Sequence, residues 1–192
     1  MKKQLVLILC LIICLTTQAQ LSAEQKIIRK VFFDFLNFYE KYEKRFNSFD
    51  LYKGKGKDNT PPYHMQWANV EKYFTYLRSS VPYVGEAYIE AEKLHFKYAD
   101  SCFKANPENE IAAGFDYDRW AGGQESISYT KKWYSSPKNK YIVTISGNAA
   151  VLKIGGELFK GAVEAERSWS IVPFVKEKGR WVMADNIYPF DN

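Results

Sequence analysis

The hydrophobic pattern of this chain changes its period near Asn106-Pro107, and this change limits the folds that the chain can adopt. Before that point, apolar residues recur every three or four positions, which is typical of helices that bury one face. After it, apolar and polar residues alternate in several short segments, as they do in half-buried strands. The order predicts the α+β class, with N-terminal helices packed on a curved antiparallel sheet of about four strands.

Three helices are predicted in the first part of the chain, at residues 22–46, 67–79 and 83–105. Ser22 followed by Gln25 has the pattern of a capping box and marks the start of the first helix. Residues 53–62 contain two glycines and two prolines without apolar periodicity, which predicts an exposed loop. This loop lacks the glycine and lysine spacing of a phosphate-binding loop.

The third predicted helix contains a stripe of small and apolar residues that we expect to face the core. The stripe consists of Ala87, Ala91, Leu94, Tyr98, Cys102 and Ala105. Cys102 is therefore interpreted as a buried thiol and not as a nucleophile. His95 is interpreted as a hydrogen-bonded helical residue, and His64 lies beside the predicted loop. Because no second histidine or cysteine stands at metal-ligand spacing, the sequence predicts no zinc site.

Strands are predicted in the second part of the chain, at residues 126–133, 141–146, 164–175 and 181–184. The glycine-containing turn at 177–180 is expected to join the last two strands as a hairpin.

Residues 1–19 have the pattern of a cleavable export signal. Two lysines precede an apolar run at 5–15, and Ala19 offers a small side chain for cleavage directly after it. The run is shorter than the roughly 20 apolar residues of a membrane-spanning helix. We expect export through the Sec route to the periplasm or out of the cell, with residues 20–192 as a single domain and no stable membrane insertion after cleavage.

Two other fates of this segment stay open. Without cleavage it would anchor the protein in the membrane, and Cys10 or Cys14 could carry a lipid, although neither follows small residues. Removal of residues 1–19 leaves Cys102 alone, so no intramolecular disulfide can form. It also removes two lysines and lowers the formal net charge from +5 to +3. Since the basic residues are interspersed with acidic ones, we expect no nucleic-acid partner.

The junction between the two parts, residues 114–125, holds the densest group of chemically capable side chains. Asp116 and Asp118 would share one face of an extended segment, which makes them candidates for a catalytic acid or base. Together with Glu125 they could instead bind calcium. We favour a third interpretation, in which the acids and glycines form turns and Arg119 neutralises an adjacent acid.

Three segments carry a resemblance to a known family: the aromatic helix 32–39, the sequence Phe-Asp-Tyr-Asp at 115–118 and the closing segment 179–187. They resemble the secreted bacterial family called domain of unknown function 3828, which has a nuclear-transport-factor-like fold. The resemblance covers most of residues 23–190 and implies a cone-shaped domain, whose curved sheet wraps against helices around a pocket. Such folds include isomerases, dehydratases and non-enzymatic binders, and the Asp, His or Tyr set of the enzymes has no match here.

Aromatic residues make up 17% of the chain, enough to fill a core and also line a cleft. We therefore favour a non-catalytic protein that binds a small ligand or a periplasmic protein without a cofactor, as a monomer or weak dimer. The candidate ligand-binding residues are Tyr117, Arg119, Trp120 and Gln124, with Trp133 and Trp169 as further candidates for the lining.

Two alternatives stay open. One is an acid–base enzyme of the isomerase or dehydratase type, with Asp116 or Asp118 as the base and Tyr117 as a hydrogen-bond donor. The other is an inhibitor or immunity-type protein that acts on a periplasmic partner through an exposed apolar patch.

Overall fold

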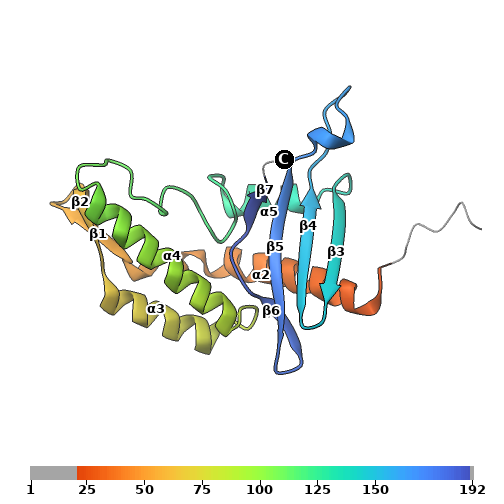
Figure 1. Ribbon diagram of the computed structural model, residues 1–192, viewed down its shortest axis with the longest axis horizontal. Coiled ribbons are helices and arrows are strands. Elements are labelled where there is room, and N and C mark those ends of the chain that lie inside the picture. The colour runs from red at the N-terminus through yellow and green to blue at the C-terminus, as the bar shows by residue number, and fades with distance from the viewer. Residues whose placement is uncertain (1–20, 191–192) are drawn as a thin grey trace, which may run out of the picture.

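The computed structural model describes residues 21–190, with helices in the first half of the chain and an antiparallel sheet in the second (Figure 1). The first half contains α2 (Ala23–Phe46), the 3-10 helix η1 (Asn47–Phe49), β1 (Tyr52–Lys55), β2 (Thr60–Met65), α3 (Trp67–Ser80) and α4 (Glu86–Ala105). The second contains α5 (Ile127–Tyr134), β3 (Lys140–Ser146), β4 (Ala149–Gly155), the 3-10 helix η2 (Glu164–Glu166), β5 (Trp169–Glu177), β6 (Arg180–Met183) and β7 (Tyr188–Phe190). The predicted α+β class is confirmed.

The predicted signal peptide lies outside the described residues, as do Cys10 and Cys14. Within residues 21–190, no helix combines the length and the apolar character needed to cross a membrane.

The large sheet has the strand order β3-β4-β5-β6, and β7 pairs with the same β5. The predicted hairpin between β5 and β6 is confirmed, and its two turn residues, Lys178 and Gly179, both have positive φ angles, of 50° and 78°. Such a pair suits the right-handed twist of a two-residue hairpin. Strand β6 pairs with β5 from Phe174 onwards, whereas β7 pairs with β5 around Ser170. The chain leaves the sheet between β6 and β7, at residues 184–187.

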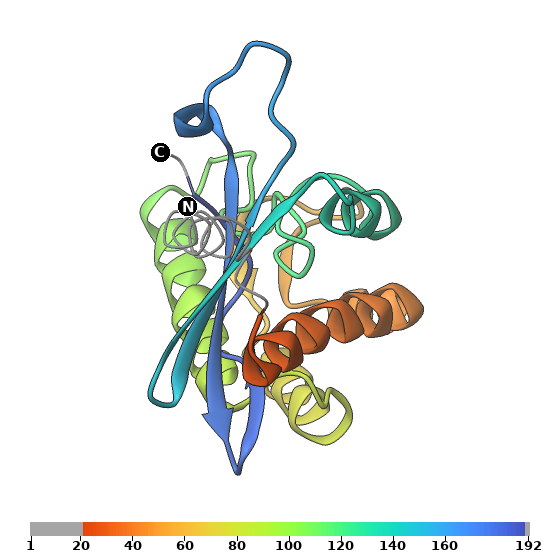
Figure 2. The same cartoon turned by 90° about the vertical axis from the view of Figure 1, so that its right-hand side faces the viewer.

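Helix α2 crosses behind the sheet in Figure 1 and runs towards the end formed by α3, α4 and the β1–β2 hairpin. Its predicted capping box is present: the Ser22 hydroxyl accepts from the Gln25 amide, and the Gln25 side chain accepts from the Ser22 amide. Figure 2 shows α2 and α5 on the same side of the sheet. The buried face of α2 carries Ile28, Phe32, Phe35, Leu36, Tyr39 and Phe46.

Helix α4 is present, but the predicted buried stripe is wrong. Leu94 and Tyr98 are each 65% exposed, and Cys102 is partly exposed. The core-facing side is instead formed by Tyr88, Ile89, Glu92, Phe96, Ala99 and Phe103. The large rings of this second stripe bury more apolar surface than the alanines of the first, so the helix turns them inward.

Three other local predictions are wrong. Residues 53–62 belong largely to the β1–β2 hairpin, which lays Tyr52 and Tyr63 against Phe103. Residues 127–133 lie in α5, with Ser126 as its N-cap, and not in a strand. The segment 164–175 starts with η2, and its strand begins only at Trp169.

The sheet and the helical half are joined at the first turn of α4. The Glu177 carboxylate, at the end of β5, accepts hydrogen bonds from the amides of Glu86 at 3.0 Å and Ala87 at 3.1 Å. These amides have no acceptor within the helix, and a carboxylate there also opposes the positive end of the helix dipole.

Candidate functional site

A cavity of about 530 Å³ opens between the end of α2, η1, the start of β1 and the segment 115–126. Seven aromatic rings line it: Tyr39, Phe46, Phe49, Tyr52, Phe115, Tyr117 and Trp120. Its polar lining includes Glu43, Asn47, Asp50, Asn59, Asp118, Arg119, Gln124 and Glu125. The cavity therefore combines an aromatic wall with carboxylate, amide and guanidinium groups.

All four predicted ligand-binding residues, Tyr117, Arg119, Trp120 and Gln124, line this one cavity. Their exposure differs: Gln124 is exposed and Tyr117 half-buried, whereas Arg119 and Trp120 are buried. Trp120 packs against Phe46 and stacks on Tyr88, and is therefore also a core residue.

The two aromatic residues that were further candidates do not line this cavity. Trp133 lies on α5 and lines a smaller pocket of about 350 Å³, and Trp169 lies at the start of β5.

The turn interpretation of the junction is confirmed at Asp118. One carboxylate oxygen, Oδ1, accepts from the amides of Trp120 at 2.9 Å and Ala121 at 3.1 Å. The other, Oδ2, accepts from the Tyr39 hydroxyl at 2.7 Å. Burial, together with the charge of Asp118 and this hydrogen bond, raises the pKa of Tyr39 well above its usual value. Asp118 thus ties the turn to α2.

The same turn needs a glycine at position 122. Gly122 has φ +74°, and an added Cβ would lie 2.7 Å from Cγ2 of Ile187. A side chain there would be strained and would clash with the core.

Asp116 does not take part in this arrangement. Its side chain is exposed and does not line the cavity, whereas Asp118 is half-buried and does. No group of three or more acidic, histidine or cysteine side chains that could hold a metal ion occurs among residues 21–190. Asp116, Asp118 and Glu125 therefore do not form the calcium site that was one of the alternatives.

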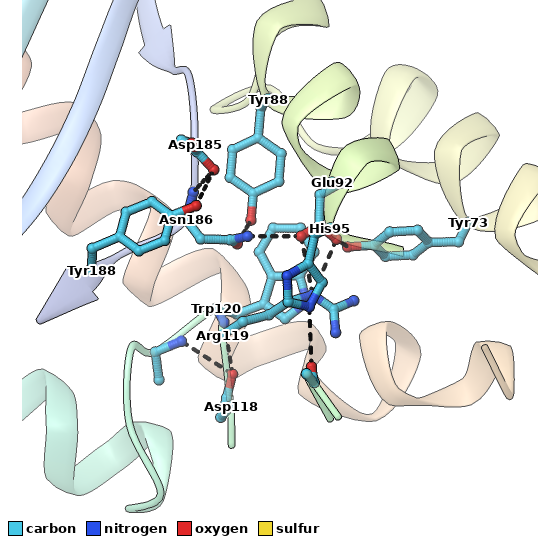
Figure 3. A network of polar contacts seen from close by, with 12 residues as sticks. Tyr73, Tyr88, Glu92, His95, Asp118, Arg119, Trp120, Asp185, Asn186 and Tyr188 are labelled. Atoms are coloured by element: carbon cyan, nitrogen blue, oxygen red, sulfur yellow. Dashed lines mark hydrogen bonds and ion pairs between the residues drawn. The ribbon is translucent and has the colours of Figure 1, made fainter. Parts of the chain in front are cut away.

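Arg119 was expected to neutralise an adjacent aspartate, but its partner is Glu92 of α4. Its Nε lies 3.1 Å from both carboxylate oxygens of Glu92, which is completely buried (Figure 3). Burial lowers the pKa of Arg119, but the neighbouring Glu92 and Tyr73 outweigh it and raise the pKa overall. The guanidinium therefore stays charged.

Three further side chains complete this buried network (Figure 3). Tyr73 donates to Glu92 at 2.8 Å, the Asn186 amide donates to the same carboxylate at 2.9 Å, and the Tyr88 hydroxyl donates to Asn186. Asn186 lies in the segment where the chain leaves the sheet between β6 and β7. Burial and the charge of Glu92 raise the pKa of both tyrosines, which keeps them protonated as donors.

Glu92 was not predicted from the sequence, and neither were its partner side chains Tyr73 and Asn186. The sequence does contain a signal for Glu92. Tyr88, Phe96 and Phe103 recur at helical spacing on one face of α4, and position 92 places a carboxylate among these rings. A charge on such a face needs a buried partner. His95 is hydrogen-bonded as predicted, with its Nε2 3.1 Å from the Gly114 carbonyl oxygen.

Comparisons with protein-family models, with curated proteins and with solved structures find no match to this chain. The resemblance to the family called domain of unknown function 3828 therefore stays a prediction, and the site is interpreted from its own geometry.

Proposed function

We propose that this protein is a non-catalytic binding protein for a small ligand, held in the cavity described above. One observation carries the proposal: Tyr117, Arg119, Trp120 and Gln124 converge on a single aromatic-lined cavity of about 530 Å³. This volume lies within the usual range of small-molecule pockets, roughly 300 to 1,000 Å³. Rigid aromatic walls also limit the entropy that is lost when a ligand binds.

The surroundings of Asp118 favour binding over acid–base catalysis. Both of its oxygens already accept hydrogen bonds, from two backbone amides and from Tyr39. A carboxylate has about four acceptor positions, so these three bonds leave only about one for a substrate proton. Asp116, the other candidate, lies outside the cavity lining.

The experiment is native mass spectrometry of the protein expressed with its own leader, followed by variants of the cavity. We expect a copurifying small molecule that is lost in Tyr117→Ala and in Gln124→Ala. Tyr98→Ala on the exposed face of α4 is the matched control and should keep it. Trp120 is unsuitable for this test, because its ring packs in the core. A bound mass that survives both cavity variants would place the ligand elsewhere and contradict the proposal.

We also propose that residues 1–19 direct export and are removed after Ala19, on the basis of the sequence pattern. Intact-mass measurement of the exported protein should give a chain that begins at Gln20. Retention of the leader in membrane fractions would favour the anchor instead.

A further inference from the structure

Most of the charged side chains that line the cavity are acidic. Four carboxylates line it, from Glu43, Asp50, Asp118 and Glu125, against one guanidinium. Among residues 21–190, none of the four forms an ion pair with a basic side chain. The guanidinium is itself neutralised by a buried glutamate. The cavity therefore keeps an excess of negative charge, which raises the local concentration of cations.

The walls between the carboxylates are aromatic, and aromatic faces attract ammonium groups that come within about 6 Å of the ring centre. The carboxylates are too dispersed to hold a metal ion, since the described residues contain no group of three or more potential ligands. Dispersed carboxylates between rings fit an organic ammonium group.

The guanidinium of Arg119 is an independent feature that points to a ligand. Its side chain is only 7% exposed, and its hydrogen bonds to Glu92 all start at Nε (Figure 3). Tyr73 also lies within hydrogen-bond reach of the guanidinium. A guanidinium has five N–H donors, so most of those on the two terminal amino groups have no acceptor in the described part of the chain. The terminal N–H groups without an acceptor are not fully enclosed, since every fully enclosed side-chain nitrogen in residues 21–190 has a partner. Arg119 also lines the cavity.

Those amino groups can donate to an oxygen of a ligand. The oxygen need not be charged, because Glu92 already balances Arg119. A ligand carboxylate would also be repelled by the four carboxylates of the lining.

We propose that the cavity binds a small organic compound that carries both an ammonium group and an uncharged acceptor oxygen, as an amino amide does. This inference rests on the proposed function of the same cavity. The ammonium group lies against the carboxylates and rings, and the oxygen accepts from the terminal amino groups of Arg119.

Isothermal titration calorimetry with three probes of similar shape tests this inference. Phenylalaninamide carries both groups, 3-phenylpropanamide lacks the ammonium group, and phenethylamine lacks the carboxamide. We expect phenylalaninamide to bind about tenfold more tightly than 3-phenylpropanamide and about fivefold more tightly than phenethylamine. Added salt should weaken the binding of phenylalaninamide but not that of 3-phenylpropanamide.

Variants of the lining carboxylates test whether these side chains cause the preference for an ammonium group. Glu43→Gln and Glu125→Gln should each lower the affinity for phenylalaninamide about threefold, by removing one charge near the ammonium group. Glu71→Gln, on the exposed side of α3, should leave the affinity unchanged.

Equal affinities for the three probes, all lost in Tyr117→Ala, would overturn the charge preference but leave ligand binding in the cavity intact. The absence of binding by every probe would also overturn this inference. The proposed function would then be decided separately, by the molecule that copurifies with the protein.

Discussion

The carboxylate of Glu92 is completely buried and accepts hydrogen bonds from Tyr73, Arg119 and Asn186. Removing one member of a buried ion pair leaves the other charge without compensation. We predict that Glu92→Gln lowers the free energy of unfolding by about 3 to 5 kcal/mol. Urea denaturation measures this change. Glu71→Gln should alter the same quantity by less than about 0.5 kcal/mol, and an equal loss in both variants would contradict the role of Glu92.

Tyr134 leads to a pH-dependent prediction. Burial raises the pKa of its hydroxyl to about 12, above its ordinary value of 10.0. The neutral form is therefore favoured by folding, so this contribution to stability is present below about pH 10 and is lost as the pH rises towards 12. Between about pH 8 and pH 11, we expect the free energy of unfolding of the unsubstituted protein to fall by about 1 kcal/mol more than that of the Tyr134→Phe variant. Guanidinium denaturation at both pH values measures the difference, and parallel losses would contradict it.

The segment 114–125 could be predicted from the sequence as part of a site, because its charged, aromatic and amide side chains are neighbours in the chain. Tyr117, Arg119 and Trp120 all fall within a few positions of the central acids. The partner of Arg119 could not be found in this way, since Glu92 lies 27 positions earlier. Which acid balances a buried arginine depends on how a helix is rotated against the turn, and local spacing does not determine this rotation.

The rotation of α4 can be tested directly. The structure turns Phe96 into the core and leaves Leu94 largely exposed, contrary to the apolar stripe that the sequence predicted. Phe96→Ala should therefore cost about 3 to 5 kcal/mol of stability, and Leu94→Ala less than about 0.5 kcal/mol. Chemical denaturation of the two variants measures the contrast. The reverse order would show that α4 packs through the other stripe.

Helix α5 shows why an alternating pattern can mislead. Ile127, Thr130 and Tyr134 recur at three- and four-residue spacing and are buried, while Tyr129 between them is exposed. In so short a segment, a few apolar positions satisfy both periods. The Ser126 hydroxyl, which accepts from the Tyr129 amide, caps the helix and marks the difference.

The whole molecule is held together by α2, which contacts β3 and β6 of the sheet, α5 and η1. The rings of the cavity wall include Tyr39 and Phe46 of this same helix. We predict a single cooperative unfolding transition, in which tryptophan fluorescence and far-ultraviolet circular dichroism coincide. Two separate transitions would show that the helical end and the sheet unfold independently.

We further predict that the protein is a monomer or a weak dimer. Light scattering coupled to size-exclusion chromatography should give a mass that approaches the monomer value on dilution. A mass that stays at twice this value at the lowest measurable concentration would contradict the prediction.

The carboxylate that caps α4 comes from a residue 91 positions beyond Glu86. A ribosome therefore synthesises the whole helix long before it adds Glu177. Until β5 and its hairpin have formed, the first amides of α4 can bind only water, and this turn should fray. Nascent chains that end before residue 177 would then keep the start of α4 open to proteases, and completion of the sheet would close it.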